Sequence, residues 1–184
     1  MQRKNEELWL ALLIGFIITV IYGLVIYWTH SIPAAGSLFG HLLGIIGFIL
    51  MLMTEVLYSF RKRSRRARWG SMESWLKFHI LTGLVGPYMV LLHSSWKFHG
   101  LAGAVTLLTL LIVLSGFIGR YIYTRIPRNL DGQEADDPTK AAGLAKARRL
   151  MAVWYAIHIP IGMALFVAAF FHIGAAIYYF TLLR

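Results

Sequence analysis

The chain has 184 residues, of which 58% are hydrophobic, and it carries a formal net charge of +10. This apolar content, with a mean hydropathy of +0.65, excludes an ordinary soluble domain and predicts an integral membrane protein. The absence of cysteine excludes disulfides, iron–sulfur clusters and haem attached through a Cys-x-x-Cys-His motif.

Five apolar stretches are each long enough to cross about 30 Å of hydrocarbon as a helix. They cover residues 8–29, 38–60, 73–95, 101–123 and 149–182. Irregular backbone cannot face lipid, and the alternating pattern of a membrane β-barrel is missing. We therefore expect an all-α integral membrane fold, a bundle of five transmembrane helices forming one domain over residues 1–184.

Basic residues gather before the first predicted span, between the second and third, and between the fourth and fifth. They are Arg3, Lys4, Arg61, Lys62, Arg63, Arg65, Arg66, Arg68, Arg125, Arg128, Lys140, Lys146, Arg148 and Arg149. The positive-inside rule then predicts a multi-pass protein of the cytoplasmic (inner) membrane, with the N-terminus in the cytoplasm and the C-terminus outside. Anionic membrane lipid accounts for the charge, and nucleic acid is not an expected partner because no soluble basic face exists.

Residues 124–147 form the only sizeable polar segment and are predicted to be a cytoplasmic loop. Pro127 is expected to end the fourth helix, and residues 131–137 are acidic and turn-forming. Asp137 and Pro138 then predict the start of an amphipathic helix that leads along the membrane surface into the fifth span. The segment is either a docking site for a partner or a solvated connector.

Two pairs of histidines share a spacing of fourteen residues, His79 with His93 and His158 with His172. Fourteen residues advance a helix by about 21 Å and return within about 40° of the same face. Each helix therefore presents two imidazoles on one stripe, one near each membrane surface. Because the third and fifth helices are expected to run parallel, we expect His79 to pair with His158 and His93 with His172. No internal repeat is recognised beyond this spacing.

Two imidazoles at each level favour haem, because a porphyrin supplies four nitrogens and its iron needs only two axial ligands. Zinc or copper would lack ligands. The histidine stripes also carry Gly83, Gly86 and Gly162, which leave room for a flat cofactor or else let helices approach one another. We expect two stacked haems b between helices three and five. Each axial imidazole should donate its other N–H to a backbone carbonyl or a hydroxyl.

Cations near the two interfaces are candidates for pairing with haem propionates, or are ordinary interfacial side chains. The candidates are Lys77, Arg120, Arg148 and Arg149 at the cytoplasmic level, and Lys97 and His99 at the outer level. Glu55 is expected to pair with Arg61 or Lys77. Tryptophans near the span ends, Trp154 among them, are interpreted as an aromatic belt.

Three further histidines, His30, His41 and His99, fall at the predicted outer surface. They are candidates for a quinone site, in which a histidine accepts a proton as the electron leaves. His41 is the best placed of them to ligate a third haem. The alternative is that all three are interfacial side chains facing water.

These features resemble the transmembrane di-haem b-type cytochromes, and most closely the ferric-reductase-like membrane domain shared with the NADPH oxidases. The resemblance covers about residues 73–182 and rests on Phe78-His79, Leu92-His93, Ile157-His158 and Phe171-His172 with their glycines. It implies haem b and one-electron transfer across the membrane. The cytochrome b of quinol:cytochrome c reductases uses a similar spacing on two helices.

The flavin- and nicotinamide-binding domain of the oxidases is not present in these residues, so the reductant is expected to come from a partner or from quinol. The sequence thus predicts an electron-conducting subunit of an oxidoreductase complex, with a c-type cytochrome or iron–sulfur protein as its partner. The alternative is a quinol-oxidising or quinone-reducing membrane anchor. A transporter or scaffold with incidental histidines is a third, non-redox hypothesis.

Overall fold

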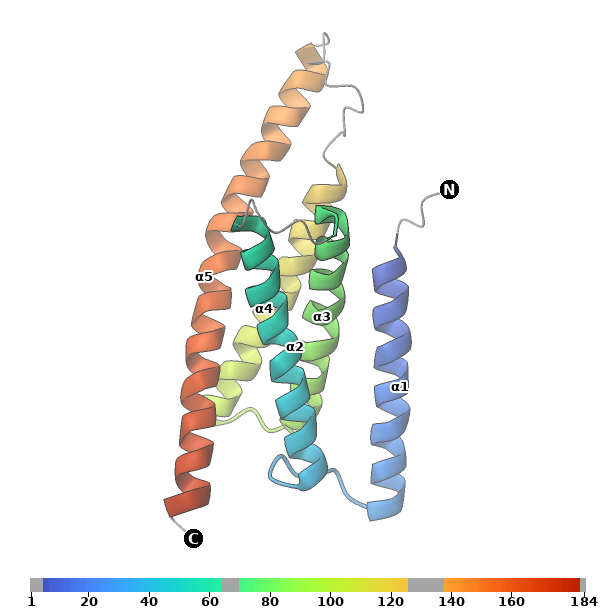
Figure 1. Cartoon of the computed structure of the whole chain (residues 1–184), viewed down its shortest axis with the longest axis vertical. Helices are drawn as coiled ribbons and strands as arrows, with labels where there is room; N and C mark the ends of the chain where they lie inside the picture. Colours follow the sequence, from blue (N-terminus) through green and yellow to red (C-terminus); the bar gives the residue numbers. More distant parts are fainter. Residues whose placement is uncertain (1–4, 64–69, 126–137, 183–184) are drawn as a thin grey trace. The chain divides into compact units, whose positions relative to one another are not determined.

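The computed structural model describes residues 5–63, 70–125 and 138–182. These residues form five α-helices: α1 (Glu6–Thr29), α2 (Leu38–Arg63), α3 (Met72–His93), α4 (Gly100–Arg125) and α5 (Pro138–Leu182), shown in Figure 1. Each helix contains a window long and apolar enough to cross a membrane. The predicted all-helical fold and the number of apolar spans are confirmed.

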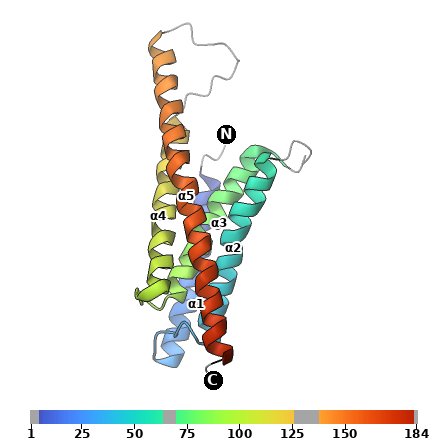
Figure 2. The ribbon, with the colours of Figure 1, turned by 90° about the vertical axis from the view of Figure 1, so that its left-hand side faces the viewer.

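The main difference from the predicted boundaries is at α5. Figure 2 shows it running without a break from Pro138 to Leu182, so the expected surface helix and the fifth span are one 45-residue helix. Pro138 is the first helical residue, as predicted, where its missing N–H costs nothing. Pro127, the acidic stretch 131–137 with Asp137, and the basic residues at 3, 4, 65, 66, 68, 128 and 184 lie outside the described residues.

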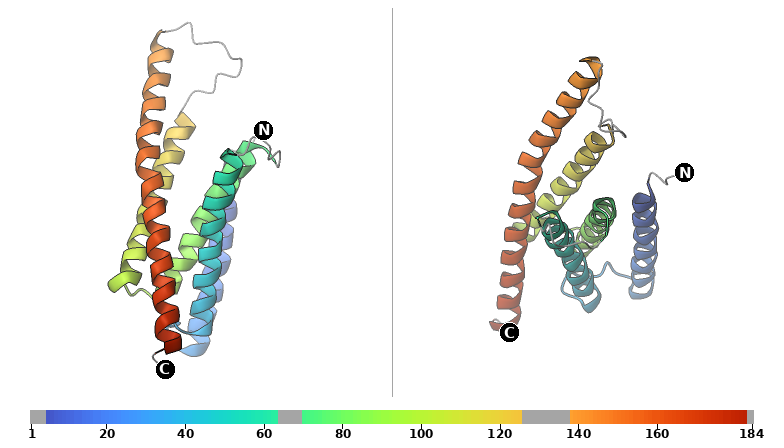
Figure 3. Two further views of the ribbon diagram at one scale, coloured as in Figure 1. Left: turned by 60° about the vertical axis from the view of Figure 1, so that its left-hand side comes forward. Right: turned by 45° about the horizontal axis from the view of Figure 1, so that its top comes forward.

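The chain forms two compact units, residues 1–106 (unit 1) and 107–184 (unit 2), and each is described by itself. In unit 1, α2 and α3 lie side by side, and α1 packs on α3 (Figure 3). The apolar core of this unit draws on all three helices: Ala11 and Tyr22 from α1, Leu43 from α2, and Val85, Met89 and Leu92 from α3.

Two glycines bring the backbones of α2 and α3 into contact. A Cβ on Gly47 would lie 2.8 Å from the Gly86 carbonyl oxygen, and a Cβ on Gly86 would lie 2.9 Å from the Gly47 carbonyl oxygen. Real Cβ atoms do not come this close, so both positions require glycine. This is the small-residue packing by which membrane helices gain van der Waals contact without a hydrophobic driving force.

One end of unit 1 is closed by the segments 30–37 and 94–99. The Ser95 hydroxyl donates to the Pro33 carbonyl at 2.6 Å, and Ser95 and Trp96 take left-handed backbone conformations, with φ of 50° and 61°. At the opposite end, the Arg61 guanidinium donates to the Gly70 carbonyl at 3.3 Å. His93 therefore lies at the end with the α1–α2 connection, and His79 lies toward the end where α3 begins.

In unit 2, α4 and α5 run antiparallel. A Cβ on Gly119 of α4 would collide with the Trp154 indole, and Gly162 of α5 lies beside Ile112 of α4. Because residue numbers rise along α4 as they fall along α5, the chain direction is opposite in the two helices.

Large apolar side chains cover much of the helix surfaces. On α1, Trp9, Leu12 and Phe16 are 72%, 64% and 66% exposed. An apolar surface of this extent is unfavourable in water but is expected for helices that face lipid chains.

Candidate functional site

His79 is held against α2 by a buried polar network. Its Nδ1 lies 3.3 Å from the Thr54 carbonyl oxygen. The Thr54 hydroxyl donates to the Thr82 hydroxyl at 2.6 Å, and that hydroxyl donates to the Phe78 carbonyl at 2.8 Å. Both threonines are buried, so the bonds that join α2 to α3 at this level are shielded from solvent.

His93 is held against the other end of α2. Its Nδ1 lies 2.8 Å from the Gly40 carbonyl oxygen. The ring also lies directly on the backbone of Gly44, since a Cβ there would be 2.9 Å from both Cγ and Nδ1 of His93. The lack of a side chain at Gly44 therefore leaves room for the His93 imidazole, and a larger residue at this position would displace the ring.

His158 has a different setting, built from α4 and α5. Its Nδ1 lies 3.0 Å from the Ser115 hydroxyl oxygen, and the Trp154 indole stacks on its ring with centroids 4.6 Å apart and planes 28° apart. The indole N–H of Trp154 donates to the Ser115 carbonyl at 2.7 Å. Ser115 thus contacts both rings through two different oxygens.

These contacts confirm the expected partners of Nδ1 at three of the histidines: two carbonyls and one hydroxyl. A carbonyl can only accept, so His79 and His93 carry their proton on Nδ1 and a lone pair on Nε2. That is the tautomer that an axial iron ligand needs, and a fixed second nitrogen is characteristic of ligating histidines. His172 is half-buried on α5. The donor set fits a haem iron bound through Nε2.

The sequence interpretation missed an internal repeat around these histidines. Residues 75–93 and 154–172 share five identities at the same register: Trp75 and Trp154, His79 and His158, Ile80 and Ile159, Gly83 and Gly162, and His93 and His172. The prediction that only the spacing is shared was therefore wrong. Superimposing the two histidine pairs position by position would have found this pattern.

Trp154, interpreted from the sequence as part of an aromatic belt, also has specific contacts that the sequence did not predict. It is half-buried, and it contacts Ser115 and His158 in the way described above. The signal was its position four residues before His158, which places both rings on one face of the helix.

The three candidate glycines fall into two kinds. Gly86 is in the close contact between α2 and α3, so helix approach explains it. Gly83 and Gly162, the pair shared by the repeat, would each accept a Cβ at ordinary distance: 3.6 Å from Thr54 Cγ2 and 3.8 Å from Ile112 Cδ1. Packing inside their own units therefore does not require glycine at these two positions.

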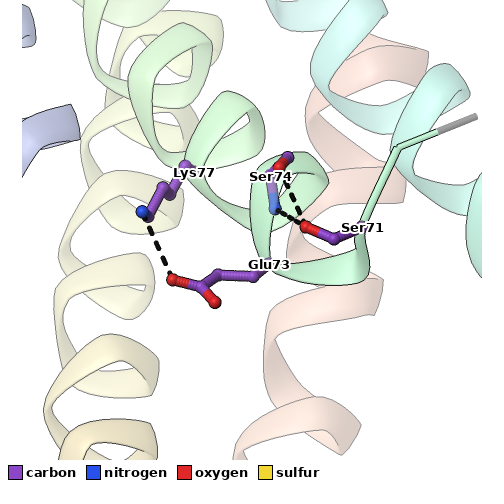
Figure 4. Close-up of polar contacts among 4 residues, drawn as sticks. All are labelled: Ser71, Glu73, Ser74 and Lys77. Carbon is purple, nitrogen blue, oxygen red and sulfur yellow. Dashed lines mark hydrogen bonds and ion pairs between the residues drawn. The ribbon is translucent and has the colours of Figure 1, made fainter. Parts of the chain in front are cut away.

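Figure 4 shows that Lys77 forms an ion pair with a residue of its own helix. Its Nζ lies 3.2 Å from Glu73 Oε1, one turn earlier, and Ser71 caps the helix by accepting from the Ser74 N–H at 3.1 Å. The expected pairing of Lys77 with Glu55 is therefore not found. Glu55 instead accepts a hydrogen bond from Ser59 at 3.1 Å.

The other candidate cations lie at or near the helix ends. Arg120 is half-buried on α4, and Arg148 and Arg149 are exposed on α5. Lys97 and His99 are exposed in the segment 94–99.

The three further histidines, His30, His41 and His99, are not gathered around one point. His41 lies beside His93, with ring centroids 6.5 Å apart, and its Nδ1 lies 3.1 Å from the Ser37 carbonyl oxygen. His30 is the exposed C-cap of α1 and lies beside Tyr27. Within the described parts of the chain, no three His, Asp or Glu side chains form a group that could hold a bare metal ion.

Pairing of His79 with His158, and of His93 with His172, would join α3 of unit 1 to α5 of unit 2. That pairing stays a prediction. Comparisons with protein families, curated proteins and solved structures give no match to this chain.

Proposed function

We propose that the chain is a membrane-embedded di-haem cytochrome b that conducts single electrons across a bilayer. The observation that supports this most is the repeated pattern of tryptophan, histidine, glycine and histidine on two apolar helices, α3 and α5. An ionisable side chain inside hydrocarbon is costly, and four histidines at a repeated spacing are better explained by a shared function than by chance.

When bound, haem supplies reversible one-electron chemistry, with a potential that depends on its ligands and on burial. The residues of the chain would bind the two haems and hold the ligand rings in orientation. His79 and His158 would ligate at one level, and His93 and His172 at the other. The Thr54 and Gly40 carbonyls and the Ser115 hydroxyl fix the orientation of three imidazoles.

Gly83 and Gly162 would leave space beside the ligands, because nothing in their own units requires glycine there. Arg120 and Lys97 would face propionates at the two levels, and Lys77 pairs with Glu73 on its own helix. The orientation, the inner-membrane location and a c-type cytochrome or iron–sulfur partner belong to the same proposal.

A haem count with a reduced-minus-oxidised absorption spectrum tests the proposal. The purified protein should contain b-type haem at two per chain, with bands that disappear on oxidation. His93→Ala or His172→Ala should each remove one haem and leave the other. A colourless protein, or single variants that keep both haems, would overturn the proposal.

A second candidate function is quinol oxidation or quinone reduction at the outer end of unit 1. The observation that favours it is His41, whose ring lies beside His93 and whose Nδ1 is directed at the Ser37 carbonyl. Its other nitrogen would then accept a hydrogen bond from a quinol hydroxyl close to the outer ligand.

Haem reduction by a soluble quinol separates the two functions. If quinone chemistry occurs here, His41→Ala should abolish quinol-dependent reduction while dithionite still reduces both haems. Leu38→Ala, which changes an exposed side chain at the start of the same helix, serves as the matched control. Equal quinol-dependent rates in wild type and His41→Ala would exclude this site.

A further inference from the structure

We infer that Ser115 and Trp154 are positioning residues that set the ring orientation and basicity of His158, and so tune one haem separately from the other. This inference rests on the proposed function, because it takes His158 to be an iron ligand. It adds two residues that the sequence pattern alone did not assign to the site.

Ser115, Trp154 and His158 contact one another in pairs. Ser115 is buried, its hydroxyl oxygen lies 3.0 Å from His158 Nδ1, and its carbonyl accepts the Trp154 indole N–H at 2.7 Å. The indole in turn stacks on the imidazole at 4.6 Å. Gly119 makes room for the indole, because a Cβ at that position would overlap it.

Each contact controls a different property of the ligand. The stacked indole limits rotation of the imidazole about its Cβ–Cγ bond, and this rotation sets the angle between the ligand ring and a haem. With haem bound, the Ser115 hydroxyl would accept a hydrogen bond from the Nδ1–H, which would make Nε2 a stronger donor to iron and would stabilise the ferric state.

The Nδ1 partner of His158 belongs to the side chain of Ser115. His79 and His93 are held by carbonyls of α2, which no substitution removes. The acceptor of His158 can therefore be deleted by Ser115→Ala and retained by Ser115→Thr, with little change to the backbone.

The experiment is an optical redox titration with low-temperature electron paramagnetic resonance, performed on the purified full chain. Ser115→Ala should raise the midpoint potential of one haem by about 59 mV, corresponding to about a tenfold shift in its one-electron equilibrium. Ser115→Thr should restore the potential. Thr181→Ala, an exposed hydroxyl on α5, should change neither haem.

Trp154→Leu and Gly119→Ala should both change the resonance signal of that same haem, because each disturbs the stacked indole. Trp154→Phe, which keeps an aromatic ring, should change it less. Gly116→Ala on the same helix, where an added Cβ meets no atom within 4 Å, is the matched control.

Unchanged potential and unchanged resonance in Ser115→Ala and Trp154→Leu, with both haems retained, would overturn the inference and leave the proposed function standing. If Ser115→Ala loses a haem, restoration by Ser115→Thr supports the inference. Failure of that restoration, together with an unaltered signal in Gly119→Ala, overturns it. A wild-type protein without haem would instead defeat the proposed function.

Discussion

Three imidazoles in this protein have Nδ1 partners of different kinds. His93 faces a carbonyl at 2.8 Å, His79 faces a carbonyl at 3.3 Å, and His158 faces a hydroxyl at 3.0 Å. A shorter bond to a better acceptor gives the imidazole more anionic character and makes it a stronger iron ligand. His93 is therefore expected to be the most strongly donating of the three.

The contact between Gly44 and His93 predicts the effect of adding a single methyl group at position 44. Gly44→Ala places a Cβ 2.9 Å from the imidazole, so the ring must move away from the Gly40 carbonyl. We expect the haem at this level to bind about 10–100-fold more weakly, while the other haem is retained. Haem content at graded haem concentrations measures the effect.

Gly36→Ala is the matched control for that change, because an added Cβ there meets no atom within 4 Å. Full occupancy of both haem sites in Gly44→Ala would show that haem binding does not depend on the observed position of the His93 imidazole.

The sequence was sufficient to propose the four histidines as candidate ligands, because spacing along a helix fixes which side chains share a face. It also predicted the kind of Nδ1 partner. It did not identify Thr54, Gly40 or Ser115 as those partners, since they come from other helices and depend on how helices pack. The contacts of Trp154 were not predicted, because a tryptophan near a span end has an ordinary explanation in the interface.

At the scale of helices, the candidate glycines and Gly47 fall into two groups by their contacts. Gly47 and Gly86 allow α2 and α3 to touch, whereas Gly83 and Gly162 are not required by contacts inside their units. The sequence could not separate the two groups, because all four glycines lie on apolar helices. Close helix contact and space for a cofactor explain each of them equally well from the sequence.

Gly86→Ala should destabilise unit 1 by about 1–3 kcal/mol, because the added methyl overpacks the contact with Gly47. The loss should appear in thermal unfolding of the haem-free protein as well as the loaded protein. Gly23→Ala on α1, with no atom near the added Cβ, should be neutral or slightly stabilising. Equal stability of the two variants would contradict the assigned packing role.

Gly162→Ala should behave in the opposite way. The haem-free protein should keep its stability or gain up to about 1 kcal/mol from better helix propensity, while haem binding weakens. Gly174→Ala on the same helix is the control, since an added Cβ there meets nothing within 4 Å. Normal haem binding by Gly162→Ala would remove the cofactor explanation for this glycine.

The start of the fifth helix was predictable, because Asp137 and Pro138 predicted a helix that leads into the fifth span, and α5 begins at Pro138. The polar turns and the span form one unbroken helix, because Ala and Lys are strong helix formers and no breaker separates the two parts.

For the whole molecule, the distribution of charge predicts the orientation in the membrane. The chain has no cysteine, so single cysteines can report sidedness without background. Lys97→Cys should react with a membrane-impermeant maleimide in intact cells, whereas Lys146→Cys should react only after lysis. Both lysines are exposed. The reverse labelling pattern would contradict the positive-inside assignment.

The partnership between α3 and α5 could be proposed from the sequence because two parallel helices with equal histidine spacing can meet level by level. The repeat of Trp, His, Ile, Gly and His strengthens it, because like positions on like helices favour like ligands.

Haem stoichiometry of paired histidine variants tests this partnership most directly. His79→Ala/His158→Ala should retain one haem per chain, because both substitutions affect the same iron, and His79→Ala/His172→Ala should retain none. Equal haem content in the two double variants, at any level, would show that the four histidines do not ligate two irons in these pairs.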